Sequence, residues 1–137
     1  MCGALALEDK TIVIGSNSPQ LHAASSLILH AIKHLADIPD KIKLLPPNII
    51  ESVRNLKTEV LNEKTLSLDL VEALIALSIS ATTNPAAQLA MEKLTKLQGC
   101  EVHMTHMPTP GDEAGLRRLG VNLTSDPNFS TKGLFVT

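Results

Sequence analysis

The stretch "TIVIGSNSPQLHAASSL" (residues 11–27) decides the predicted fold, because it reads as a strand, a polar turn and the start of a helix. The apolar run 11–14 stops at Gly15, and Ser16-Asn17-Ser18 forms the turn. Pro19 then opens a helical pattern, with the preceding serine predicted as its N-cap. Since phosphate groups also bind at helix N-termini, the turn is a candidate anion site as well as a helix cap.

Outward from this stretch, short apolar runs alternate with helical patterns. The pattern predicts strands at 5–8 and 11–14 as a hairpin, then a helix at 19–36, a strand at 41–45, a helix at 48–57, a polar connection at 58–66, helices at 67–80 and 85–97, a strand at 101–107, a helix at 109–119, a strand at 121–124 and an irregular tail beyond Ser125. A strand over 74–79 is the alternative to part of the helix at 67–80, because a short apolar run does not separate the two by periodicity.

Strands separated by helices predict an α/β fold, here a three-layer α/β/α sandwich. The sheet is expected to be mixed: largely parallel, with one antiparallel hairpin at its edge. Residues 1–137 are interpreted as one domain. In the helix predicted at 19–36, one face is apolar and the other carries three polar side chains. The apolar face holds Leu21, Ala24, Ile28, Ile32 and Leu35, and the opposite face holds His30, Lys33 and Asp37.

The composition is that of a globular chain with an aliphatic core. Of 137 residues, 44% are hydrophobic and 19% charged, Tyr and Trp are absent, and the formal net charge is −2. Without aromatic platforms or a basic stripe, nucleic acid is not an expected partner. No apolar run has the length of a membrane span and no signal peptide is recognised, so no membrane partner is expected. With Cys2 and Cys100 as two separate cysteines, we expect a reduced, cytoplasmic protein.

Two loops share the same pattern of small polar residues followed by proline. Ser16, Asn17 and Ser18 precede one helix, and Thr82, Thr83 and Asn84 precede another. A single anionic ligand could be held by both if they meet at one edge of the sheet. Neither loop has the second glycine and the lysine of a phosphate-binding loop. Capping is therefore favoured over anion binding at both loops.

Other candidate groups have no supporting motif. His30 and His34 are four residues apart on one helix, whereas His103 and His106 are expected on opposite faces of a strand. No metal-binding or nucleophile motif accompanies them, so no metal, cofactor or catalytic residue is predicted. The remaining assignments are a buried, inert Cys100, acids at Asp112, Glu113 and Asp126 placed in loops or a first helical turn, and a solvated Arg117-Arg118 pair.

Three segments resemble a known bacterial family. "EALIALSISATTNPAAQLAMEKLTKLQGCEVH" (72–103), "LGVNLTSDPNFSTK" (119–132) and the opening "ALALEDKTIVIGS" (4–16) are similar to the C-terminal portion of the family called domain of unknown function 1846. The resemblance implies a fold like that of the cytidine deaminases. It carries no deaminase chemistry, because the His-x-Glu and Pro-Cys-x-x-Cys zinc motifs are absent. Family members have a lysine and a threonine where this chain has Ser16-Asn17.

The family members are longer and carry a glycine-rich, phosphate-loop-like N-terminal region. The resemblance therefore implies a C-terminal subdomain, which fits a hairpin that starts at Met1. We interpret the chain as a non-catalytic structural or interaction subdomain, and not as a zinc deaminase. The expected partner is the family's N-terminal region or a second copy of the chain. The alternative function is binding of a nucleotide or phosphorylated small molecule at 16–19 and 82–85.

Overall fold

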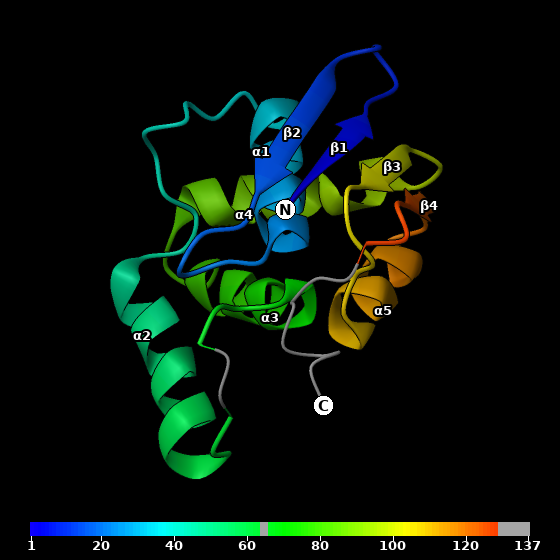
Figure 1. Ribbon diagram of the computed structural model, residues 1–137. Helices are drawn as coiled ribbons and strands as arrows, with labels where there is room; N and C mark the ends of the chain where they lie inside the picture. The colour runs from blue at the N-terminus through cyan, green and yellow to red at the C-terminus, as the bar shows by residue number, and fades with distance from the viewer. Residues whose placement is uncertain (64–65, 129–137) are drawn as a thin grey trace.

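The elements follow one another as strands first, then helices, then a closing strand–helix–strand unit (Figure 1). The computed structural model describes residues 1–63 and 66–128. Their elements are β1 (Cys2–Ala6), β2 (Ile12–Ser16), α1 (Ala23–Leu35), α2 (Pro47–Asn55), the π-helix η1 (Leu56–Val60), α3 (Leu70–Ser80), α4 (Pro85–Glu92), the 3₁₀ helix η2 (Leu94–Leu97), β3 (Glu101–Met104), α5 (Pro110–Arg118) and β4 (Asn122–Ser125).

The four strands form one mixed sheet in the order β2-β1-β3-β4. The predicted hairpin is confirmed, with β1 antiparallel to β2. The expectation of a largely parallel sheet is wrong, because β1 and β3 are also antiparallel and only β3 and β4 run parallel. The connection through α5 is the crossover that a parallel pair requires.

The strand predicted at 41–45 is absent, and these residues form turns and bends. Leu44 and Leu45 are buried, but their segment packs against helices instead of pairing with the sheet. The Leu44 carbonyl accepts a hydrogen bond from Ser80 Oγ at the end of α3, and the Asp40 and Ile42 carbonyls accept from Lys33 Nζ on α1. Short apolar runs can be buried in either way, and periodicity does not separate the two.

The helix α1 lies at the centre of the molecule, between the sheet and the other helices. Its apolar side chains, including Leu27 and Ile28, are fully buried. A Cβ on Gly15 of β2 would collide with the backbone of Leu27, so glycine allows this close approach. Lys33, predicted on the outer side, is only 8% exposed because the 37–42 segment folds over it.

The first helix starts later than predicted, at Ala23 with His22 as N-cap. Ser18 Oγ accepts from the backbone amides of Gln20 and Leu21, but this closes a turn and not the helix. Residues 20–22 stay outside the helix because they pair with Leu68. The Gln20 carbonyl accepts from Leu68 N–H, and the Leu68 carbonyl accepts from His22 N–H. This long-range pairing delays the helix by four residues.

The remaining helices follow the predicted order with shifted boundaries. The helical interpretation of 67–80 is confirmed over the alternative strand, and a capping box between Asp69 and Glu72 starts α3. The second helix begins at Pro47 instead of Asn48, because proline suits the first helical position. It continues as η1 through Val60, where a polar connection was predicted. Asn84 caps α4 as predicted.

The two faces of the sheet differ in what covers them. On the inner face, Leu5, Val102 and Met104 are buried towards α1. On the outer face Ile12 and Ile14 are 60% and 64% exposed. In the ranges that the structure describes, helices therefore leave this outer face open. No described helix is both long and apolar enough to cross a membrane.

Candidate functional site

The two candidate anion loops are connected to opposite ends of α3. Residues 20–22 follow the first loop directly and pair with Leu68, just before the N-terminus of α3. The second loop follows the C-terminus of α3, where Asn84 Oδ1 accepts from Ala86 N–H. At about 1.5 Å per residue, the 11 residues of α3 make this helix roughly 16 Å long. The contact of one small ligand with both loops stays a prediction.

Taken singly, each loop works as a cap or a turn. The amides of Gln20 and Leu21, which would hold an anion, already donate to Ser18 Oγ. Ser16 and Asn17 are exposed, and so are Thr82 and Thr83. Anion binding at either loop alone stays a prediction.

A different cluster forms where the N-termini of α1, α3 and α5 meet. Its centre is Asp112, a carboxylate in the first turn of α5 that is only 1% exposed. Oδ1 accepts from the backbone amide of Leu70 at the start of α3, at 2.8 Å. Oδ2 lies 2.9 Å from Nδ1 of His22, the N-cap of α1. One buried carboxylate thus joins three helix N-termini.

His22 is the partly accessible member of this pair. Its side chain is 19% exposed, and its backbone N–H is fixed on the Leu68 carbonyl. The hydrogen bond to Asp112 raises the pKa of the His22 imidazole, against the opposing effect of burial. Because a carboxylate only accepts hydrogen bonds, Nδ1 carries the proton that is shared with Asp112.

A second carboxylate network borders the cluster on the α3 side. Asp69 Oδ1 caps the amide of Glu72, and Glu72 Oε1 accepts from the amide of Asp69. Glu72 also pairs with the buried Lys57 Nζ at 2.8 Å. Burial raises the pKa of the Asp69 carboxyl. A Cβ on Gly111 would meet the carboxylate of Asp69, so α5 and α3 lie close together here.

His106 is a second buried imidazole near the cluster. It is 5% exposed, and among the described residues its Nδ1 atom has no hydrogen-bond partner. Burial lowers the pKa of His106, and His22 and Asp112 are close enough for their charges to influence it. The two histidines were predicted on opposite faces of one strand, but β3 ends at Met104 and His106 lies beyond it. His103 is exposed on β3 and hydrogen-bonded to Thr124 Oγ1 at 2.7 Å.

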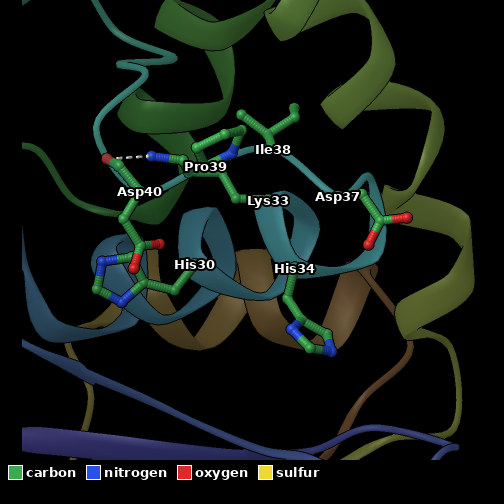
Figure 2. Close-up of a pocket in the computed structure, with 7 residues that line it drawn as sticks. All are labelled: His30, Lys33, His34, Asp37, Ile38, Pro39 and Asp40. Atoms are coloured by element: carbon green, nitrogen blue, oxygen red, sulfur yellow. Dashed lines mark hydrogen bonds between the residues drawn. The ribbon is translucent and has the colours of Figure 1, made fainter.

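The histidine pair on α1 lines a separate, open pocket of about 310 Å³ (Figure 2). His30 and His34 project from the same helix, and Lys33 reaches the Asp40 carbonyl beside them. His30 Nδ1 is hydrogen-bonded to the Ile14 carbonyl, and His34 Nε2 lies 3.8 Å from Asp9. Within residues 1–63 and 66–128, no group of three or more histidine, cysteine or acidic side chains could hold a metal ion.

Several other single residues behave as predicted. Cys100 is buried, and burial raises the pKa of its thiol. Arg117 and Arg118 are exposed, and Arg117 pairs with Glu113 at 2.9 Å. Of the three acids predicted in loops or a first helical turn, only Asp112 is buried in a network.

The sequence did not single out His22 or Asp112. His22 was predicted inside a helix that in fact begins after it, and Asp112 resembles any acid in a first helical turn. The helix predicted at 109–119 is confirmed, and Thr109 Oγ1 caps it by accepting from Asp112 N–H. The 90 residues between the histidine and the aspartate give no local signal of their contact.

The fold and the cluster define a small α/β domain with a mixed sheet and a buried histidine–aspartate pair. The family described as "Domain of unknown function DUF1846, C-terminal" matches residues 1–135, and the chain belongs to this family. Over 132 residues it is 48% identical to a UPF0371 protein of Clostridium botulinum (strain Alaska E43 / Type E3). It is 46% identical to the UPF0371 protein of Clostridioides difficile (strain 630) and 44% identical to that of Clostridium tetani (strain Massachusetts / E88).

Each of these matches covers 96% of this chain but only 26% of the relative. The chain therefore spans about a quarter of the length of the curated relatives that it matches. The family match agrees with the resemblance that the sequence itself indicated, including its restriction to the C-terminal part.

Proposed function

We propose that this chain is an interaction domain, and that the outer face of its sheet docks against the N-terminal part of the family protein. The observation that carries this proposal is the apolar half of that face. Ile14 lies opposite Ala4, and Ile12 lies opposite Ala6, across the β1–β2 ladder. These four residues form one apolar patch, which we call the outer patch.

The other half of the outer face is polar and is satisfied within the chain. His103 bonds to Thr124 and Asp126, and Asn122 bonds to Glu101. In the outer patch, by contrast, the apolar side chains of Ile12 and Ile14 stay more than half exposed. Covering each isoleucine would contribute about 1–2 kcal/mol, which favours docking of another surface.

The N-terminal part of the family protein is proposed as the occupant because of the length of the relatives. About three quarters of each relative lies outside the matched part, so a covering surface can belong to the same polypeptide. The edge of β2 is less suited to adding a strand, because His30 already occupies the Ile14 carbonyl there. A helical layer on the outer patch would complete the three-layer sandwich and the cytidine-deaminase-like topology, both of which remain part of this proposal. The cytoplasmic location that is expected from two free cysteines is also part of this proposal.

The test compares two matched double variants in a full-length chimera, in which this chain replaces the matching 132 residues of the Clostridium botulinum relative. Ile12→Thr with Ile14→Thr removes the outer patch but keeps β-branched residues in the strand. We expect this variant to lower the melting temperature of the chimera while leaving that of the isolated chain nearly unchanged. Ile75→Thr with Ile79→Thr is the control, since these isoleucines are 55% and 50% exposed on α3.

Three outcomes would contradict the proposal. An unchanged melting temperature of the chimera would show that nothing docks on the outer patch. A larger loss from the α3 control would place the docking surface on α3 instead. If the isolated chain sediments as a dimer that the outer-patch variant separates, the occupant is a second copy.

A further inference from the structure

The pair of His22 and Asp112 has the geometry of a proton-transfer pair. This geometry does not depend on docking at the outer patch. Asp112 is buried with both carboxylate oxygens in use, one on the Leu70 amide and one on His22. The imidazole is held through Nδ1, so in its neutral form the lone pair is on Nε2. A buried carboxylate that orients an imidazole in this way stabilises the imidazolium formed when Nε2 takes up a proton.

The backbone fixes both partners before any ligand binds. His22 is pinned by its N–H on the Leu68 carbonyl, and Asp112 is pinned in the first turn of α5 by the Thr109 cap. A Cβ on Gly115 would come within 2.8 Å of Leu70 Cδ2, so α5 and α3 are in close contact beside the pair. Contacts with α1, α3 and α5 thus hold His22 and Asp112 in place, and little reorganisation is needed during proton transfer.

The partial exposure of His22 distinguishes this pair from a fully buried pair that only joins helices. Asp112 is enclosed, whereas the His22 side chain keeps 19% of its surface exposed. Proton exchange with a ligand needs this combination of a buried orienting group and a reachable imidazole. The buried His106 and the Asp69 carboxyl lie around it, and burial shifts the pKa of both.

We propose that His22 and Asp112 form a proton-transfer dyad, in which His22 Nε2 accepts a proton from a water molecule or a ligand hydroxyl group bound beside α1. The hydroxyl oxygen loses its proton to Nε2 and keeps the electron pair of the O–H bond. The imidazolium that results is stabilised by Asp112 and returns the proton in the reverse step. His22 is the group that touches the ligand, and Asp112 is a positioning residue.

The test uses p-nitrophenyl acetate as a probe for a reactive imidazole in the full chain. Water attacks the ester carbonyl while its proton passes to Nε2, and p-nitrophenolate and acetate are the products. We expect His22→Gln to lower the rate of p-nitrophenolate release by at least about tenfold, since general bases typically contribute a hundredfold or more. Asp112→Asn should lower the rate and also move its pH midpoint downward. His30→Gln is the control, because His30 is an exposed imidazole on the same helix.

A second measurement covers the case in which Asp112→Asn does not fold. The ¹⁵N shifts of the wild-type imidazoles report which ring nitrogen of His22 is protonated. We expect the Nδ1–H form, with a protonation midpoint above that of a free imidazole. Equal ester-cleavage rates for wild type and His22→Gln would overturn the proposal, and so would an Nε2–H form of His22.

Discussion

The two ends of α1 are anchored by different chemistry. At the N-terminal end, His22 meets the buried Asp112, and two further carboxylates and Lys57 lie close by. At the C-terminal end, Lys33 donates to the backbone carbonyls of Asp40 and Ile42, which are neutral acceptors. The first end depends on the His22 imidazole, which titrates near neutral pH, whereas the second joins a cation to peptide carbonyls. Sensitivity to pH and to loss of charge should therefore concentrate at the N-terminal end.

The largest expected effect comes from Asp112→Ala. The substitution leaves the Leu70 amide and the His22 imidazole without their buried partner. Breaking a buried charged pair typically costs about 3–5 kcal/mol, and we expect a loss of that size in the free energy of unfolding. Urea denaturation measures it. Glu113→Ala is the control, because Glu113 lies on the same helix in an exposed pair. Equal losses in the free energy of unfolding would show that Asp112 contributes no more to stability than the exposed Glu113.

A smaller effect is expected at the opposite end from Lys33→Met. Asp40 and Ile42 lie in an exposed segment, so their carbonyls can turn to water when the ammonium group is removed. The buried methylene groups are largely retained in methionine. We expect a loss of about 1–2 kcal/mol in urea denaturation. Lys41→Met, at an exposed position of the same segment, should cost almost nothing. A loss that matches Asp112→Ala would remove the contrast between the two ends.

The smallest effect is the change of stability with pH. The pKa of His22 is raised, so its contribution is complete below about pH 6.5 and is lost as pH rises through the folded-state pKa. The pKa of His106 is lowered, so stability falls as pH drops below about 6.5 through its folded-state pKa. We expect His22→Gln to remove the decline on the alkaline side and His106→Gln the decline on the acidic side. The free energy of unfolding, measured by urea denaturation at steps from about pH 5 to 8, checks both.

The Lys33→Met variant sharpens this last comparison. Its pH profile should run parallel to that of the wild type, because the C-terminal end of α1 has no histidine–carboxylate pair at comparable burial among the described residues. A profile that loses either decline in Lys33→Met would mean that the two ends are coupled.

The sequence predicted the order of most elements but placed several boundaries wrongly. The hairpin, the helical form of α3 and the Asn84 cap are confirmed, because each depends on neighbouring residues. The strand at 41–45 and the early start of α1 were wrong. In both cases the local structure depends on residues that are distant in the sequence. Lys33 and Ser80 hold the first segment by hydrogen bonds, and Leu68 keeps 20–22 out of the helix.

By itself, the sequence determined the α/β class, an aliphatic core and membership of the family, because composition, local periodicity and motif similarity are properties of the chain. Only the tertiary structure decided that β1 lies antiparallel to β3 and that the two candidate loops sit at opposite ends of α3. It also decided that His22 meets Asp112. The physical reason is the same in each case. These contacts join residues far apart in the chain, and their free energy depends on burial that no local pattern specifies.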